Sequence, residues 1–341
     1  MLGTRLLAIA IGVKTAAEAR AALARAARVA DLAELRVDFL EEELDLPALL
    51  KDRPLPVIVT DRAAREGGRS YRGDPERVAV LRQAAELGAE FVDVEWDTAS
   101  PEIVRSLQTT GTRVIVSRHA FDRMPAEIDR WAANAVDVGA DVVKVVGMAG
   151  DPRDVLPVLR VLRDVDRPTI AIAMGEAGIA SRVLALRYER CLLTFAALDR
   201  GGAVAPGQLP IDELRDGYNA RRIGSSTQVF GVLAPHREDL LIRRFNAWFI
   251  GHGVDVVAVP FIARTEAIEI LSDLREIPVS GWYVPDEMLQ RELAGSLPNL
   301  APEARRRGLV NSVTFEASGP RGSWQATPSD QVEAWAGLAV R

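Results

Sequence analysis

The 341-residue chain is poor in cysteine, histidine and lysine, and each shortage excludes a class of structure or site. Its single cysteine, Cys191, excludes an internal disulfide and a multi-cysteine zinc site. No apolar run reaches the roughly 20 residues that a membrane helix needs. Lysine occurs only at Lys14, Lys51 and Lys144, although Lys and Arg together number 42. Arginine therefore carries most of the positive charge, and a lysine in a buried position calls for a specific reason.

The overall balance of residues is that of a globular protein. Hydrophobic residues make up 48% and charged residues 26%, which excludes a disordered or fibrous chain. A net charge of −6 disfavours a general nucleic-acid binder, because such a protein needs a basic excess. The short apolar stretch 6–13 resembles a signal peptide but fits a buried strand equally well. We expect a cytoplasmic protein with about two domains and neither a membrane nor a nucleic-acid partner.

The first two thirds of the chain alternate short Val- and Ile-rich runs with amphipathic helical patterns. Near-continuous apolar strands between helices indicate a parallel sheet covered by helices. Eight such units favour a (β/α)₈ TIM barrel over an open doubly wound sheet, and no G-x-G-x-x-G follows the first strand. The eight predicted strands are Leu6–Ile11, Ala33–Phe39, Pro56–Asp61, Phe91–Trp96, Arg113–His119, Val142–Met148, Pro168–Met174 and Leu192–Leu198.

A polar stretch at 218–228 separates the barrel, predicted over residues 1–222, from a second unit over 227–341. This second unit is predicted to be a small α/β domain, since it is too short for another barrel. The fold class is therefore α/β, with a barrel followed by a small α/β domain. Predicted strands are Val229–Leu233, Val254–Phe261 and Val279–Val284, and predicted helices are Glu238–Ile250, Thr265–Arg275 and Glu287–Ala294.

Charged residues gather where the barrel strands end, which is where barrel enzymes place their chemistry. Glu34, Arg36 and Asp38 are two residues apart, so an extended strand points all three toward the barrel interior. Buried charges are costly unless they pair with each other or with a ligand. Further charged residues follow the third strand (Arg62, Glu66), lie on the fourth (Asp93, Glu95) and end the fifth (His119).

Lys144 lies inside an apolar strand and is the strongest single signal. Unlike arginine, a desolvated lysine loses its proton readily and becomes a nucleophile. Lys144 is therefore a candidate for Schiff-base formation with a carbonyl substrate. The alternative is a structural ion pair with an acidic neighbour such as Glu95.

Two further residues fit such chemistry. His119 ends the strand that precedes the Lys144 strand, which suits a general acid or base, although a buried core histidine is the alternative. Arg182 follows Ser181 in a loop that leads into a helix, where Ser181 would cap the helix and Arg182 would bind a carboxylate bidentately. The alternative for Arg182 is a solvated arginine at a helix start.

Taken in order, these segments resemble type I 3-dehydroquinate dehydratase. The resemblance covers roughly residues 5–218 and implies a (β/α)₈ barrel, usually dimeric, that needs no metal or cofactor. The matching segments are Glu34-Leu-Arg36-Val-Asp38, Thr60-Asp-Arg62 with Glu66-Gly-Gly68, Asp93-Val-Glu95, Ser117-Arg-His119, Val143-Lys144-Val145, Met174-Gly to Ser181-Arg182, and Ala205-Pro-Gly-Gln208.

The resemblance implies a role for each matching residue in the shikimate pathway reaction. Lys144 would form an imine with the C3 ketone of 3-dehydroquinate, and His119, held by Glu66, would transfer protons in a syn elimination. Arg182 would bind the substrate carboxylate. The residues implied to bind substrate hydroxyls are Glu34, Arg36, Arg62 and Gln208.

The chain departs from the family pattern at three places. Val204 replaces a serine in the loop that closes over substrate, Ala120 follows the histidine where Asp or Asn is usual, and Gly147-Met148 ends the sixth strand. Because one lost hydrogen bond is worth roughly 1–3 kcal/mol, we expect a slower or weaker-binding enzyme. Another Schiff-base lyase or aldolase, or a silent barrel used for binding or assembly, remains an alternative.

The second unit is similar to the substrate-binding half of shikimate dehydrogenase over residues 229–315. The family's functional motifs are replaced by Ala234-Pro-His-Arg-Glu-Asp239 and Trp282-Tyr-Val-Pro-Asp-Glu287, and the unit contains no lysine. No segment after Trp324 is long enough for the nicotinamide-binding half. We therefore expect a non-catalytic appendage that binds a shikimate-like ligand or builds an oligomer.

Overall fold

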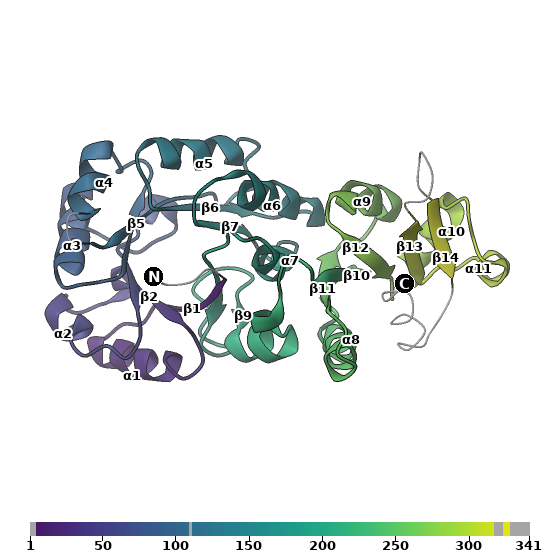
Figure 1. Ribbon diagram of the computed structural model, residues 1–341, viewed down its shortest axis with the longest axis horizontal. Helices are drawn as coiled ribbons and strands as arrows, with labels where there is room; N and C mark the ends of the chain where they lie inside the picture. Colours follow the sequence, from purple (N-terminus) through teal and green to yellow (C-terminus); the bar gives the residue numbers. More distant parts are fainter. Residues whose placement is uncertain (1–4, 109–110, 317–322, 328–341) are drawn as a thin grey trace.

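The computed structural model describes residues 5–108, 111–316 and 323–327, which form two α/β units (Figure 1). The larger unit has one sheet in the order β7-β6-β5-β4-β3-β2-β1-β8-β9, with parallel neighbours throughout. Its strands are β1 (Leu6–Ile11), β2 (Leu32–Arg36), β3 (Val57–Thr60), β4 (Phe91–Glu95), β5 (Arg113–His119), β6 (Val142–Met148), β7 (Thr169–Met174), β8 (Leu193–Ala197) and β9 (Leu209–Pro210).

The first eight strands curl until the two ends of the ring meet. A parallel bridge joins Thr169 at the start of β7 to Cys191 just before β8, and Leu192 N donates to Thr169 O at 2.9 Å. Eight parallel strands in cyclic order, with helices outside, form the predicted (β/α)₈ barrel. The predicted fold class is confirmed.

Alternation along each strand produces two apolar layers. One set of side chains, including Ile58, Phe91 and Ile115, fills the barrel interior, and the alternate set packs beneath the helices.

The barrel helices follow the strands in sequence, and Thr15 begins the first, α1, with a capping box to Glu18. The barrel helices are α1 (Ala16–Ala26), α2 (Leu46–Leu50), α3 (Asp74–Glu86), α4 (Pro101–Gln108), α5 (Ile128–Asp137), α6 (Val155–Asp164) and α7 (Ile179–Leu184).

The largest departure from the predicted barrel strands is at the end of β2, which stops three residues early. β2 ends at Arg36, and Val37–Phe39 form a 3₁₀ turn, η1, instead of continuing the strand. The Asp38 carboxylate accepts from Arg36 Nε at 2.8 Å and from Arg36 Nη2 at 2.7 Å. The prediction that Asp38 continues the inward face of an extended strand is therefore wrong, although its side chain is buried.

The second unit has a mixed sheet in the order β11-β10-β12-β13-β14, and Phe230, Phe245 and Phe249 contribute to its core. The antiparallel strands β13 and β14 were not expected from the sequence. Its strands are β10 (Gln228–Ala234), β11 (Val256–Ile262), β12 (Val279–Tyr283), β13 (Ser312–Glu316) and β14 (Ser323–Thr327), and its helices are α8 (Asp239–Gly251), α9 (Ala267–Asp273), α10 (Glu287–Ser296) and α11 (Pro302–Arg307). The predicted absence of a nicotinamide-binding half concerns residues that lie mostly outside the described chain.

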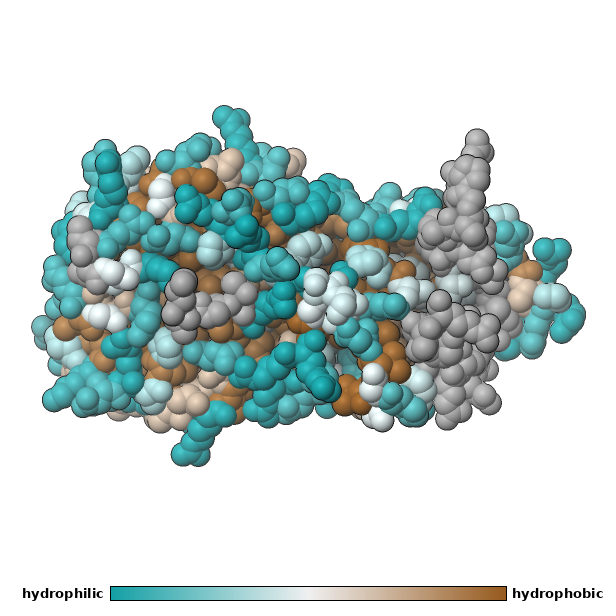
Figure 2. Space-filling view, in the orientation of Figure 1, coloured by the Kyte–Doolittle hydropathy of each residue, from teal (hydrophilic) through white to brown (hydrophobic). Residues whose placement is uncertain are grey.

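The surface in Figure 2 is largely hydrophilic, and hydrophobic residues reach it near α8, where Leu240 and Ile250 are exposed. Among the described residues, no helix has both the length and the apolar character required to cross a bilayer. The barrel sheet ends at Pro210 and the second sheet begins at Gln228, so the predicted junction at 218–228 lies between them.

Candidate active site

A pocket opens where the barrel strands end, and it contains every residue that the sequence predicted for the site. The strands position these side chains at one face because the carboxyl ends of parallel barrel strands meet there. The predicted residues that line the pocket are Glu34, Arg36, Arg62, Glu66, His119, Lys144, Arg182 and Gln208.

Lys144 projects from β6 into this pocket and is buried. Its Nζ lies 3.1 Å from Glu34 Oε1 and 2.8 Å from Asp93 Oδ2. It also lies 4.9 Å from the centre of the Phe195 ring. The acidic neighbours of Lys144 are therefore Glu34 and Asp93, whereas Glu95, the partner named in the ion-pair alternative, bonds to Arg62 and Arg77.

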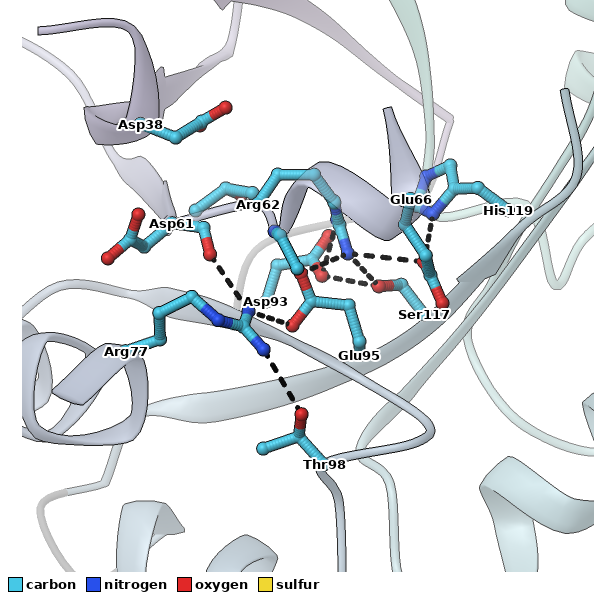
Figure 3. A network of polar contacts seen from close by, with 12 residues as sticks. Asp38, Asp61, Arg62, Glu66, Arg77, Asp93, Glu95, Thr98, Ser117 and His119 are labelled. Carbon is cyan, nitrogen blue, oxygen red and sulfur yellow. Dashed lines mark hydrogen bonds and ion pairs between the residues drawn. The ribbon is translucent and has the colours of Figure 1, made fainter. Parts of the chain in front are cut away.

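Arg62 lies at the centre of a buried polar network (Figure 3). Its Nη2 donates to Asp93 Oδ1 and its Nη1 to Ser117 Oγ, each at 2.7 Å, and Ser117 Oγ donates to Asp93 Oδ1 at 2.6 Å. Burial alone would raise the pKa of Asp93, but Arg62 and Lys144 hold that pKa well below its ordinary value. Asp93 is therefore a fixed carboxylate that orients the Lys144 amine.

A second buried arginine, on helix α3, extends this network. Arg77 of α3 is fully buried, donates to Asp61 O at 3.1 Å and pairs with Glu95. The other oxygen of Glu95 accepts from Ala63 N at 2.9 Å, which fixes the loop that carries Glu66. The sequence analysis missed Arg77, because an arginine on an amphipathic helix gives no signal of burial.

His119 and Glu66 form a hydrogen-bonded pair, with Nδ1 of the ring 2.9 Å from Oε2 of the carboxyl group. Burial, Arg62 and Lys144 hold the pKa of His119 well below its ordinary value, so the ring is neutral at pH 7. Burial raises the pKa of Glu66 to about 7, against the opposing charge of Arg62. When Glu66 is ionised, Nδ1–H donates to it and Nε2 is left as the basic nitrogen.

Arg182 is buried on α7 and differs from the other cations of the pocket in having no acidic partner. Its Nη2 donates to Pro206 O at 2.9 Å, its Nε has no partner, and no carboxylate of the described residues forms an ion pair with it. Burial lowers its pKa to about 10. A buried cation in this state favours an anionic ligand such as a carboxylate.

Ser181 does not cap α7 as predicted, because the helix begins earlier, with Gly178 at the N-cap. The Ser181 hydroxyl instead donates to Gly178 O at 2.7 Å and accepts from Ala173 N at 3.0 Å. These bonds tie the start of α7 to the end of β7 and thereby fix the height of Arg182 above the pocket.

The remaining wall of the pocket is apolar and includes the loop at 204–208. Gln208 Oε1 accepts from Val204 N at 2.9 Å, which folds this loop on itself. Gly207 has φ +74°, and a Cβ there would lie 2.5 Å from Gly175 O, so the loop requires glycine at this point. The apolar lining residues are Phe121, Val146, Ile172, Met174, Phe195, Val204 and Ala205.

Of the other two departures from the family pattern, one has a packing explanation. A Cβ on Gly147 would lie 2.7 Å from both Met124 Sδ and Pro125 Cδ, so glycine allows the loop after β5 to pack against β6. Nothing in the structure explains Ala120. Within residues 5–108, 111–316 and 323–327, no cluster of His, Cys, Asp or Glu has the arrangement of a metal site.

The family model for type I 3-dehydroquinase matches residues 7–225, which is more than half of the chain and contains the whole pocket. The chain belongs to the type I 3-dehydroquinase family. This family consists of hydro-lyases of the shikimate pathway, so the resemblance noted in the barrel sequence is confirmed.

Two curated relatives show how the similarity is distributed. The bifunctional 3-dehydroquinate dehydratase/shikimate dehydrogenase of Arabidopsis thaliana, a chloroplastic protein, is 40% identical over 213 residues, which are 60% of this chain and 35% of that protein. The chain thus spans about a third of that relative. The 3-dehydroquinate dehydratase of Methanocaldococcus jannaschii is 35% identical over 195 residues, which are 55% of this chain and 86% of that protein.

Solved structures agree with the sequence relatives on the barrel. The 3-dehydroquinate dehydratase of Geobacillus kaustophilus superposes with a TM-score of 0.57 at 27% identity and covers 62% of this chain and 88% of its own. The type I enzyme of Clostridium difficile, crystallised with covalently modified comenic acid, gives a TM-score of 0.56 at 25% identity over 62% of this chain and 90% of its own.

Proposed function

We propose that the barrel pocket dehydrates 3-dehydroquinate to 3-dehydroshikimate through a Schiff base on Lys144. The observation that supports this most directly is the shared pocket: the buried Lys144 amine, the His119–Glu66 pair and the unpaired Arg182 all face it. A nucleophilic amine, a neutral base and a site for a carboxylate are the three groups that this reaction needs.

The first step joins Lys144 to the substrate. Nζ attacks the C3 ketone, and water leaves with protons that His119 helps to move, so that a protonated imine forms. Glu34 and Asp93 lie within hydrogen-bond distance of Nζ and hold it toward the ketone. Asp93 also stabilises the positive charge of the iminium nitrogen, because Asp93 remains ionised.

The iminium withdraws electrons and acidifies the neighbouring carbon. Nε2 of His119 removes a proton from C2, and the electron pair moves to form an enamine. The same nitrogen then protonates the C1 hydroxyl, which leaves as water in a syn elimination while the enamine returns to the iminium. Hydrolysis of the imine releases 3-dehydroshikimate and restores the Lys144 amine.

Substrate orientation depends on groups around the reacting carbons. Arg182 pairs with the substrate carboxylate, which supplies the anion that its environment lacks. Glu34, Arg36, Arg62 and Gln208 bind hydroxyl groups, while the apolar wall excludes water from the ring.

A direct assay of turnover tests this proposal, because the product contains a conjugated double bond that absorbs in the ultraviolet. We expect Lys144→Met to lose activity by at least 1,000-fold, which corresponds to about 4 kcal/mol in the barrier. Lys51→Met, a matched change at an exposed lysine, should retain full activity. Undiminished activity in Lys144→Met would overturn the Schiff base on Lys144, and a parent protein without turnover would favour a different reaction or a silent barrel.

We also infer that the protein is a cytoplasmic homodimer, as the family tendency and the acidic, globular composition suggest. Size-exclusion chromatography coupled to light scattering measures the mass of the assembled protein. A single species at twice the 37.1 kDa chain mass is expected, and a monomer at micromolar concentration would contradict the inference.

A further inference from the structure

The second unit packs against the helix that carries Arg182. Figure 1 shows α7 beside β11, which is an edge strand of the five-stranded sheet, and these two elements are in contact. All six residues of α7 are buried. A short surface helix normally buries one face only, so burial on every side means that α7 is enclosed between the barrel and the second unit.

Both ends of α7 are fixed by polar contacts. The start is tied to β7 through Ser181, and the 3₁₀ turn that follows the helix holds Arg187. Arg187 Nε donates to Thr227 O at 2.7 Å and its Nη2 donates to Ser225 O at 3.0 Å. Both acceptors belong to the segment that leads into β10, so the chain entering the second unit is bonded to the end of α7.

Ion pairs join the two units on either side of this contact. Arg153 Nη2 lies 2.8 Å from Glu266 Oε2, and Arg160 Nε lies 2.9 Å from Glu276 Oε1. Arg163 Nη1 lies 3.3 Å from Glu276 Oε1, and Arg153 Nη1 lies 3.4 Å from Asp273 Oδ2. A further contact involves Glu213, a buried residue of the barrel. Its carboxylate oxygens lie 3.5 Å from Arg237 Nη1 and 3.5 Å from Arg243 Nη2 of the second unit.

We infer that the second unit is a positioning element for the substrate-carboxylate site: by enclosing α7 it holds Arg182 in the pocket. This inference rests on the proposed function. Arg182 has no acidic partner, and its guanidinium is held only by the hydrogen bond to Pro206 O and by the packing of the helix that carries it. Without that packing, α7 would expose apolar residues and the guanidinium would turn toward water, since an unpaired cation is favoured there.

The test reverses the three acidic residues of the second unit that face arginines of the barrel. In the variant Glu266→Arg/Asp273→Arg/Glu276→Arg, KM for 3-dehydroquinate should rise at least tenfold with kcat changed less than threefold. This split is expected because a carboxylate contact made equally in the ground and transition states affects binding alone. Hydrogen exchange should increase in the peptide 179–187.

Two controls separate this inference from a general loss of structure. Adding Arg153→Glu/Arg160→Glu/Arg163→Glu to the reversed variant restores opposite charges and should return KM and exchange to within threefold of the parent values. The variant Glu287→Arg/Glu303→Arg, whose acids pair with Arg291 and Arg307 inside the second unit, should change neither.

An unchanged KM in the reversed variant, with or without faster exchange at 179–187, would overturn the inference. Failure to restore KM in the double-sided variant, when its exchange is normal, would overturn it as well. If the parent protein does not turn over 3-dehydroquinate, the proposed function fails. The exchange measurements would still decide whether the second unit holds α7 in place.

Discussion

Arg62 and Arg182 are both buried in the pocket, but their surroundings are opposite in charge. Three carboxylates surround Arg62, at 2.7 Å (Asp93), 3.3 Å (Glu95) and 3.7 Å (Glu66). Arg182 has only a backbone oxygen for a partner. Arg62 lines the pocket but is held by the protein's own carboxylates, whereas Arg182 is arranged for an anionic ligand, and substitutions should separate their effects on stability.

Arg182→Leu should weaken substrate binding without weakening the fold. Loss of a charge-assisted contact raises KM by about 10- to 100-fold, and removal of an unpaired buried charge leaves the unfolding free energy equal or higher by about 1 kcal/mol. Arg62→Leu, the matched control, should lower the unfolding free energy by about 3 kcal/mol or more, because it leaves buried carboxylates without their cationic partner. Steady-state kinetics and urea unfolding measure both. A strongly destabilised Arg182→Leu would contradict this assignment.

The His119–Glu66 pair sets the pH dependence of the reaction. Below a pH of about 7, Glu66 is protonated and donates to Nδ1, so the ring proton moves to Nε2 and the base is lost. We predict that kcat/KM rises with pH through about 7 and that Glu66→Gln flattens this limb. Since burial raises the pKa of Glu66 from its ordinary value of 4.5 to about 7, Glu66 also makes the fold progressively less stable as pH rises from about 4.5 to about 7, and the substitution should remove that decrease.

Sequence alternation located most of the site residues but not their partners. Glu34 was predicted to face the barrel interior from its spacing with Arg36, and Lys144 was predicted to lie inside a buried apolar strand. Both line the pocket. That Lys144 pairs with Asp93 and not with Glu95 depends on the height of each side chain along β4 relative to β6. Such heights follow from the stagger of three strands, which a single sequence does not specify.

At the scale of elements, the loop at 204–208 combines a lost hydroxyl with a packing gain. Val204 packs against the apolar interior of the barrel, and a Cβ on Gly12 would lie 2.8 Å from its Cγ1. The side chain thus fills space above the end of β1. Valine in place of the serine of the family pattern gives up a hydroxyl group and packs against the apolar interior of the barrel.

Val204→Ser should therefore have opposite effects on binding and stability. We predict a KM lower by roughly 5-fold or more, from one additional hydrogen bond, and an unfolding free energy lower by about 1 kcal/mol, from lost packing. Val204→Ala, which removes methyl groups without adding a hydroxyl, should lose stability but gain no affinity. Equal KM values in the serine and alanine variants would refute the hydroxyl explanation.

The barrel strands were predictable because each is a short apolar run between helical patterns. η1 was missed because the bidentate Arg36–Asp38 pair turns the backbone at a point where apolar alternation continues. β13 and β14 were missed because each has only five residues with two apolar ones, which is too short an alternation to identify a strand. Both misses concern local geometry that tertiary contacts determine.

At the scale of the whole molecule, the loop after β10 is engaged by the barrel. Arg237 of this loop pairs with Asp239 and with Glu213 of the barrel. This loop is one of the segments where the chain departs from the shikimate dehydrogenase pattern, and its Arg237 contacts the first unit. We predict no oxidation of shikimate with NADP by the full chain, and measurable NADPH formation would refute a non-catalytic second unit.

The central claim is that Lys144 forms a covalent imine with the substrate. The most direct measurement is the intact mass of the full chain after incubation with 3-dehydroquinate and borohydride, followed by peptide mapping. The account predicts a single reduced adduct on the peptide that contains Lys144, with Lys14 and Lys51 unmodified. A folded protein with no adduct, or with an adduct on another lysine, would contradict it.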